Sequence, residues 1–144
     1  MTRYIIDASV AIKWFVPEDG SEHALTLARG HRLVAPDLLV VECANILWKK
    51  ARRSEISKDD ASLAGRLLER AEIELVPMRD LVAKSIEFGI ELDHPAYDCV
   101  YLALASKLAS PFVTADESLI RKVGRGRARR LGFSLLTMGQ AAGS

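Results

Sequence analysis

Short apolar runs alternate with helical segments along all 144 residues, and this alternation limits the fold more than any other feature of the chain. Strand-like runs are predicted at residues 4–6, 33–35, 73–76, 112–113 and 133–136. Parallel strands joined by helical crossovers form a sheet that is covered by helices on both faces. The sequence therefore predicts an α/β fold with a mostly parallel sheet of about five short strands, in which residues 1–144 form one domain.

Capping residues and glycines set the predicted helix ends. Ser21 is a candidate N-cap for the helix that follows the first turn region. Gly89 is expected to end a helix over residues 80–88. Thr114 and Glu117 have the spacing of a capping box and predict that a helix begins directly after the fourth strand.

The composition is typical of a soluble globular protein, with 49% hydrophobic and 27% charged residues. No apolar run approaches the roughly 20 residues that cross a bilayer, and residues 1–7 are too short and too soon acidic for a signal peptide. We therefore expect a cytoplasmic protein with no membrane partner. Cys43 and Cys99 lie in apolar runs and are expected to be reduced core thiols.

Two acidic residues occur where the local sequence is otherwise apolar or leaves a strand. Asp7 follows the first apolar run, and an N-cap is the simplest interpretation of this residue alone. Glu42 lies in a helical segment with almost no polar face, where Asn45 is its polar neighbour one turn away. Since Glu is rarely buried without a partner, Glu42 must reach a cation, a hydrogen-bond network or a wet cleft. A salt bridge remains an alternative.

Two further acids have the same character. Asp98 is the single charge between Pro95 and Ala105, and Asp116 lies shortly after Thr114. Each is explained separately by the favourable effect of an acid on the first turn of a helix. In parallel sheets, however, ligands bind beyond the carboxyl ends of the strands, where Asp7 and Asp116 are expected. The four acids together therefore favour one shared site.

A cluster of four carboxylates needs a cation. Two carboxylates about 4 Å apart repel by about 4 kcal/mol at an effective dielectric near 20. Oxygen ligands favour Mg²⁺ or Mn²⁺, and the scattered positions of His23, His31 and His94 do not suggest a zinc site. Such an ion suggests phosphoryl-transfer chemistry, for example hydrolysis of a phosphodiester.

Three polar residues lie near the predicted ligands in the sequence. Ser9 and Thr114 each lie two residues from an acid, and their hydroxyls can hydrogen-bond a water molecule on the metal. Helix capping is the alternative for both residues. Asn45 is expected to support Glu42 in the same way.

The order of these residues resembles the PIN-domain family, and specifically the VapC-type toxins of bacterial and archaeal toxin-antitoxin pairs. The similarity covers nearly the whole chain and rests on four segments: residues 4–15 (YIIDASVAIKWF), Glu42 with Asn45 and Leu47, residues 97–105 (YDCVYLALA), and residues 114–116 (TAD). As a set these segments are specific, whereas each alone is weak.

The resemblance implies a metal-dependent endoribonuclease whose catalytic and metal-binding acids are Asp7, Glu42, Asp98 and Asp116. It also implies a homodimer that is held inactive by a small antitoxin protein. Ser118 stands where some PIN nucleases have a further acid, which leaves the number of bound metals open. A housekeeping RNA-processing nuclease without an antitoxin and an inert protein-binding module are alternative interpretations.

Another enzyme class also begins with an acid after the first strand. Aspartyl-phosphate phosphatases would use Asp7 as a nucleophile, with a second Asp two residues further on. Ser9 occupies that position and makes this alternative weaker.

Basic residues are unevenly distributed although the net charge is only +1. Because an RNA substrate requires cations near the pocket, we expect one cluster to bind RNA, with a solvated loop or an antitoxin contact as the alternatives. Its members are Arg121, Lys122, Arg125, Arg127, Arg129 and Arg130, and the intervening glycines would let this segment adapt to a backbone. A second cluster, residues 49–53, is more simply explained by favourable charge at the carboxyl end of a helix. Trp14 and Trp48 are candidates for dimer contacts, with burial in the core as the alternative.

Overall fold

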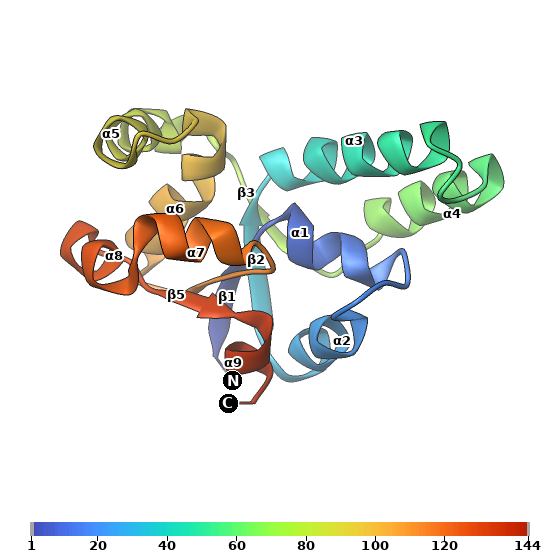
Figure 1. Ribbon diagram of the computed structural model, residues 1–144, viewed down its shortest axis with the longest axis horizontal. Helices are drawn as coiled ribbons and strands as arrows, with labels where there is room; N and C mark the ends of the chain where they lie inside the picture. Colours follow the sequence, from blue (N-terminus) through green and yellow to red (C-terminus); the bar gives the residue numbers. More distant parts are fainter. Residues whose placement is uncertain (1, 144) are drawn as a thin grey trace.

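The computed structural model of the protein describes residues 2–143. The sheet is five-stranded and parallel, in the order β3-β2-β1-β4-β5 (Figure 1). Its strands are β1 (Arg3–Ile6), β2 (Arg32–Pro36), β3 (Glu74–Val76), β4 (Phe112–Thr114) and β5 (Leu135–Thr137). The predicted α/β fold is therefore confirmed.

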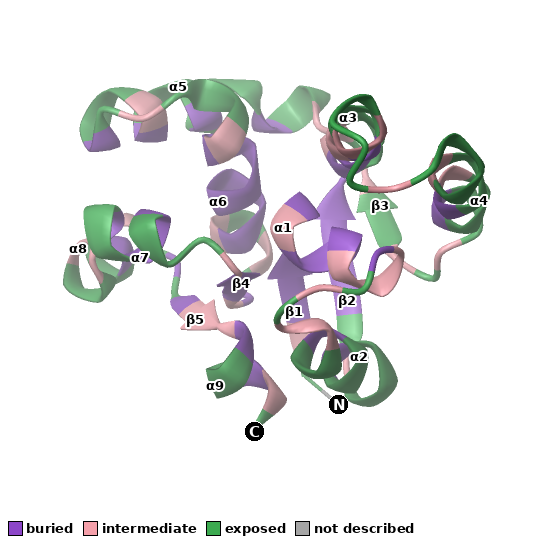
Figure 2. Ribbon diagram, turned by 45° about the vertical axis from the view of Figure 1, so that its right-hand side comes forward, coloured by how far each residue is buried: buried purple, intermediate pink, exposed green. Residues whose placement is uncertain are grey.

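Helices connect all consecutive strands and cover the sheet on both sides. In chain order they are α1 (Ala8–Ala11), α2 (Ser21–Gly30), α3 (Leu38–Arg52), α4 (Lys58–Glu69), α5 (Val82–Leu92), α6 (Ala96–Leu108), α7 (Glu117–Val123), α8 (Arg125–Leu131) and α9 (Met138–Ala142). Short 3-10 helices occur at η1 (Ile12–Trp14) and η2 (Arg79–Leu81). The central strands and α6 are largely buried, whereas α3, α4 and α5 are exposed on their outer sides (Figure 2).

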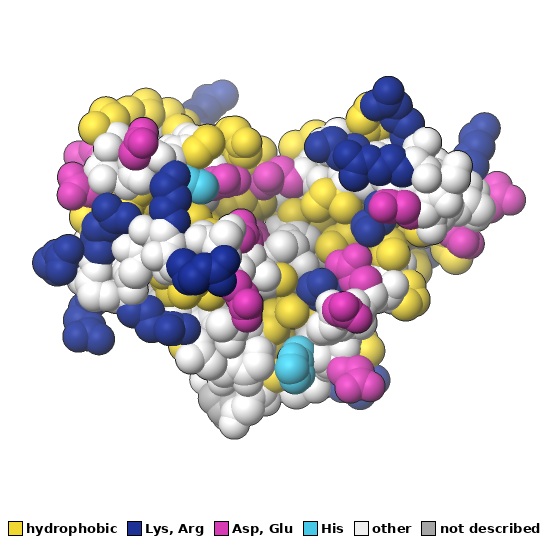
Figure 3. Space-filling model, viewed as in Figure 1, with side chains coloured by type: hydrophobic (Ala, Val, Ile, Leu, Met, Phe, Trp, Pro, Cys, Tyr) yellow, Lys and Arg dark blue, Asp and Glu magenta, His cyan; other side chains and the backbone are white. Residues whose placement is uncertain are grey.

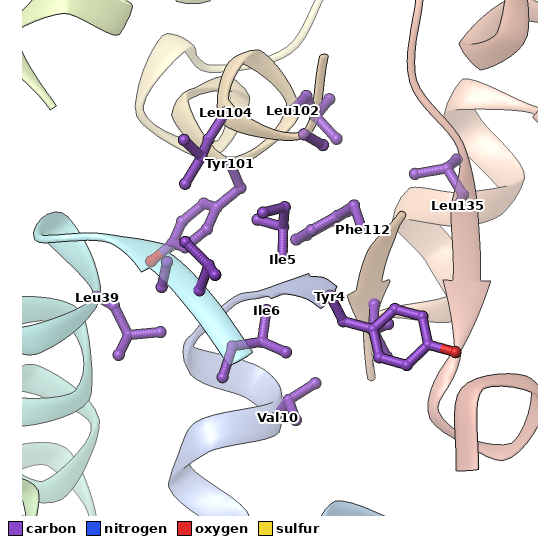
Figure 4. Close-up of a cluster of buried hydrophobic side chains, with 14 of the residues drawn as sticks. Tyr4, Ile5, Ile6, Val10, Leu39, Tyr101, Leu102, Leu104, Phe112 and Leu135 are labelled. Carbon is purple, nitrogen blue, oxygen red and sulfur yellow. The ribbon is translucent and has the colours of Figure 1, made fainter. Parts of the chain in front are cut away.

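The core has two layers because successive strand residues point to opposite faces of the sheet. Ile5 and Phe112 point toward α6 and its Leu102, whereas Ile6 points toward Val10 of α1 (Figure 4). All five side chains are fully buried. Burial of each large aliphatic or aromatic side chain contributes roughly 1.5–3 kcal/mol, so the central strands are held firmly from both faces.

The topology places a crevice beside the first strand. The chain leaves β1, builds β2 and β3 on one side, and returns to place β4 and β5 on the other side. The strand order therefore reverses between β1 and β4, which is where open parallel sheets bind ligands. Asp7 directly follows β1 and Asp116 follows β4 by two residues.

Two predicted helix ends are wrong. The N-cap of α2 is Gly20, with φ of 89°, and Ser21 is the first helical residue. The helix α5 continues through Gly89 and ends at Leu92, with Asp93 as its C-cap at a φ of 50°. Gly89 permits close packing instead, since a Cβ there would lie 3.0 Å from the carbonyl oxygen of His94.

The basic segment over residues 121–130 is not a flexible loop. It comprises the end of α7 and nearly all of α8, with a break at Gly124, whose φ is 79°. Cys43 and Cys99 are buried free thiols, as predicted. Within the described residues, the helices are too short or too polar to cross a bilayer.

Candidate active site

A pocket of about 190 Å³ lies beyond the carboxyl ends of β1 and β4. All four acids selected from the sequence line it. Its lining residues are Asp7, Ala8, Ser9, Glu42, Ile46, Asp98, Tyr101, Phe112, Asp116 and Leu119. Acidic side chains are visible in the central hollow of the molecule (Figure 3). The fold therefore brings together carboxylates that are up to 109 residues apart in the sequence, from Asp7 to Asp116.

Asp7 is fixed by two hydroxyl groups at the junction of β1 and β4. Ser9 Oγ donates to Asp7 Oδ1 at 2.5 Å, and Thr114 Oγ1 donates to Asp7 Oδ2 at 2.7 Å. Asp7 forms no side-chain cap on α1, so its carboxylate remains directed into the pocket. Ser9 and Thr114, which the sequence places in a supporting role, thus orient an acid directly.

Burial makes a charge on Asp7 costly. Desolvation raises the pKa of Asp7 to about 6, although the hydrogen bonds from Ser9 and Thr114 act in the opposite direction. The nearby charge of Asp116 raises the pKa further. A bound cation would favour the charged form of Asp7, so this carboxylate is suited to act as a metal ligand.

Glu42 enters the same pocket from α3. Its Oε1 accepts a hydrogen bond from the hydroxyl group of Tyr101, and no cation lies within salt-bridge distance of it among residues 2–143. Burial raises the pKa of Glu42, Tyr101 lowers it, and the charges of Asp98 and Asp7 raise it again. The salt-bridge interpretation of Glu42 is therefore not supported. Asn45 is exposed and lies outside the pocket lining.

Asp98 is held by a chain of hydrogen bonds from two other elements. His94 Nε2 lies 2.8 Å from Asp98 Oδ2, and Lys122 Nζ lies 3.0 Å from His94 Nδ1. Because an ammonium group can only donate, Nδ1 accepts from Lys122, and Nε2 is the ring nitrogen that donates to the carboxylate. Lys122 also donates to the carbonyl oxygen of Asp93 at 2.7 Å, which ties α7 to the turn before α6.

His94 and Tyr101 are functional candidates that sequence reasoning did not connect with the acids. Tyr101 lies three residues after Asp98 on α6, and His94 lies four residues before Asp98 in the turn that precedes this helix. The start of α6 at Ala96 and the packing of α3 on the sheet determine which acid His94 and Tyr101 each contact. The sequence alone does not give these two features.

Asp116 both caps α7 and lines the pocket. Its Oδ1 accepts hydrogen bonds from Leu119 N at 3.1 Å and from Ser118 Oγ at 2.5 Å. The hydrogen bond from Ser118 is the main reason that the pKa of Asp116 lies below its ordinary value, against the opposing effect of burial. The predicted Thr114–Glu117 capping box is therefore wrong, because the hydroxyl of Thr114 bonds to Asp7 and Asp116 caps the helix.

The donor set fits a hard divalent cation. Glu42 Oε2, Asp98 Oδ1 and Asp116 Oδ2 accept no hydrogen bond from the described residues, while the other oxygen of each carboxylate is held by the protein. Oxygen ligands of this kind are those that Mg²⁺ and Mn²⁺ prefer. Within residues 2–143, no three Asp, Glu, His or Cys side chains are arranged closely enough to hold a metal ion together. Mg²⁺ generally retains several water molecules and is bound through only one or two carboxylates, so it does not require such a cluster.

A larger hollow elsewhere has no comparable chemistry. It has a volume of about 590 Å³ and lies between η1, α2 and the amino ends of β2 and β3. Two of its charged side chains, Arg32 and Glu74, pair with each other at 2.9 Å. The acidic pocket is therefore the stronger candidate for an active site.

The predicted RNA-binding segment is partly engaged within the protein. Arg125 donates to Leu135 O and Gln140 Oε1, and Arg127 donates to the carbonyl oxygens of Val123 and Lys122. Arg121, Arg129 and Arg130 form no ion pair or hydrogen bond through their side chains within the described residues and are exposed. RNA binding by these three cations therefore stays a prediction.

Comparison with known proteins identifies the fold family. The family model described as PIN domain matches residues 4–125. The chain belongs to the PIN-domain family. Ribonuclease VapC3 of Pyrobaculum aerophilum is 31% identical over 131 residues, which cover 83% of this chain and 94% of the relative. Ribonuclease VapC9 of Mycobacterium tuberculosis is 32% identical over 112 residues, covering 78% and 84% respectively.

Solved structures show the same fold. PAE2754 from Pyrobaculum aerophilum has a TM-score of 0.69 at 20% identity and covers 99% of this PIN domain and 97% of its own chain. VapBC2 from Rickettsia felis, bound to a DNA fragment from its promoter, has a TM-score of 0.63 at 12% identity, with coverages of 94% and 98%. The sarcin-ricin loop cleaving toxin VapC20 of Mycobacterium tuberculosis has a TM-score of 0.62 at 14% identity, with coverages of 90% and 95%.

Proposed function

We propose that this PIN-domain protein is a Mg²⁺- or Mn²⁺-dependent endoribonuclease and the toxin of a VapBC-type pair. The observation that carries this proposal is the convergence of Asp7, Glu42, Asp98 and Asp116 on one pocket at the reversal of the strand order. Relatives that share about a third of their residues with the chain are named VapC ribonucleases, which supports the substrate class.

The four acids act mainly as ligands in the proposed reaction. When bound, a divalent cation would favour deprotonation of the attacking water and stabilise the charge that develops on the phosphate. Ser9 and Thr114 hold Asp7, Tyr101 holds Glu42, and His94 holds Asp98, so each carboxylate is oriented before the ion enters. This preorganisation lowers the cost of assembling the site.

An antitoxin and a second copy of the chain complete the proposal. The structural relative from Rickettsia felis is a VapBC2 assembly, in which a VapC protein is named together with VapB, and this supports a small protein partner. The exposed apolar side chains of Val82, Ile86 and Ile90 follow one face of α5 at four-residue spacing and offer a surface for a homodimer. We further propose that residues 1–144 act as a single cytoplasmic nuclease domain.

Cleavage of RNA by the purified chain tests this function. The protein is freed of any partner and incubated with structured RNA and Mg²⁺ or Mn²⁺. We expect cuts in single-stranded or loop regions, since an A-form duplex hides its bases from side chains. Addition of EDTA should stop the reaction, and an absence of cleavage with both metals would contradict the proposal.

A further inference from the structure

Helix α3 connects the acidic pocket to a basic surface. Glu42 lies in the first half of the helix, and the second half carries Lys49, Lys50 and Arg52, with Arg53 directly after it. Figure 3 shows Lys and Arg side chains gathered over α3. Lys50 is paired with Glu18 at 3.3 Å, whereas Lys49, Arg52 and Arg53 form no ion pair within residues 2–143.

Two of these free cations continue the face of the helix on which Glu42 lies. Lys49 is seven residues from Glu42 and Arg53 is four residues further, which is the spacing of one helix face. At 1.5 Å per residue they lie roughly 10 and 16 Å from Glu42 along the helix axis. All three positions beyond the pocket on this line, Asn45 included, are exposed. The line thus leads outward from the acids.

Trp48 directly precedes Lys49, about 100° around the helix axis from it, and is exposed. Its side chain is 55% exposed, and the Arg52 guanidinium lies 5.5 Å from its ring centroid. Trp14, in contrast, is partly buried and donates its indole N–H to Ala24 O at 2.7 Å. Trp48 therefore packs little of its ring within its own chain, and an aromatic ring among free cations is the usual platform for an unpaired base.

The geometry points to a binding track for single-stranded RNA along α3, in which Trp48 stacks on a base and Lys49 and Arg53 contact phosphates of the strand entering the acidic pocket. This inference rests on the proposed ribonuclease function. It differs from the simple view that the cations only complement the carboxyl end of the helix, because that view gives no role to an exposed Trp.

Charge favours RNA over two protein occupants of this surface. A basic segment of a protein partner would meet like charges here. In a symmetric dimer formed through this patch, the cations of one copy would face the same cations of the other. The phosphates of RNA instead neutralise them and release counterions.

Binding is measured on the full chain carrying Asp98→Asn, so that the probe stays intact. The probe is a short fluorescein-labelled single-stranded RNA of mixed sequence. Trp48→Ala is expected to raise Kd about tenfold or more. The double change Lys49→Ala with Arg53→Ala is expected to reduce the slope of log Kd against log salt by about 1.4. Lys107→Ala, an exposed cation at the far end of α6, is the matched control and should leave both quantities unchanged.

Fluorescence supplies a readout that a structural role for Trp48 would not produce. The emission of Trp48 is obtained by subtracting the fluorescence of the Trp48→Phe variant from that of the chain with Trp48. Binding of the RNA should quench this emission. Trp48→Phe should retain part of the affinity because a benzene ring also stacks. If Trp48→Ala fails to fold, the quenching of Trp48 and the affinity of Trp48→Phe together test whether Trp48 stacks on RNA.

Three results separate the possible failures. Unchanged affinity and no quenching, in a protein that cleaves RNA with Mn²⁺, would overturn the track and leave the proposed function intact. No cleavage by the unmodified chain would overturn the proposed function itself. A Trp48→Ala variant that sediments as a smaller species would identify the surface as a contact between copies and would also overturn the track.

Discussion

At the residue scale, the decisive feature is a carboxylate that the protein orients but does not neutralise. Ser9 and Thr114 donate to Asp7, yet they do not offset its burial, and its pKa rises to about 6. No cation pairs with this carboxylate within residues 2–143. Burial of the uncompensated charge on Asp7 costs free energy, and a bound cation would offset this cost.

Asp7 should make the metal-free protein less stable as the pH rises. The pKa of Asp7 in the folded state exceeds the unfolded value of 3.8. The contribution of Asp7 to the free energy of unfolding is therefore fully present below about pH 4 and is lost as the pH rises through about 6. The loss is on the order of 2–3 kcal/mol. Urea unfolding in EDTA across this range should show a smaller decline for Asp7→Asn than for the unmodified chain. An equal decline in both proteins would contradict the assignment.

Asp98→Asn should separate activity from stability. We expect cleavage to fall by more than about a hundredfold, because loss of outer groups at metal sites already costs 10- to 100-fold. The metal-free variant should unfold at the same or a higher temperature, since like-charge repulsion with Glu42 is removed. Asp93→Asn, an exposed neighbour, is the control for loss of charge alone. A large loss of thermal stability confined to Asp98→Asn would indicate a structural acid instead.

At the element scale, the packing of α5 on α6 positions the His94–Asp98 pair. Gly89 permits a close approach between α5 and the turn before α6, since a Cβ there would meet His94 O at 3.0 Å. Gly65 in α4 has open space around its Cβ position and supplies a matched comparison.

The two glycines should respond oppositely to alanine. Gly65→Ala should stabilise the protein by up to about 1 kcal/mol because Ala is the better helix former. Gly89→Ala should lose this gain and become destabilising, because the carbonyl of His94 must shift. Chemical denaturation measures both free energies of unfolding. Equal stabilisation by the two substitutions would show that the close approach at Gly89 has no energetic effect.

The exposed face of α5 should govern self-association. Ile90 is 79% exposed, and with Val82 and Ile86 it forms an apolar stripe. Ile90→Asp is expected to shift the protein toward monomer in analytical ultracentrifugation while leaving its helical content unchanged. Identical sedimentation of the variant and the unmodified chain would exclude this face as the dimer contact.

At the scale of the whole molecule, sequence patterns predicted the elements and the four acids but not the contacts between them. The sheet and the pocket follow from periodicity and from acids at strand ends. The hydrogen bonds of Tyr101 to Glu42 and of Lys122 to His94 span 59 and 28 residues, and local patterns contain no such information. The wrong capping box has the same origin, because the hydroxyl of Thr114 has a distant partner in Asp7.

Direct measurement of Mn²⁺ binding tests the central claim that four distant carboxylates form one cation site. Isothermal titration of the purified chain should show saturable binding near neutral pH, and Asp98→Asn and Glu42→Gln should each weaken it at least tenfold, while Asp93→Asn should not. Binding that is absent, or that is unchanged by neutralisation of these acids, would contradict the account.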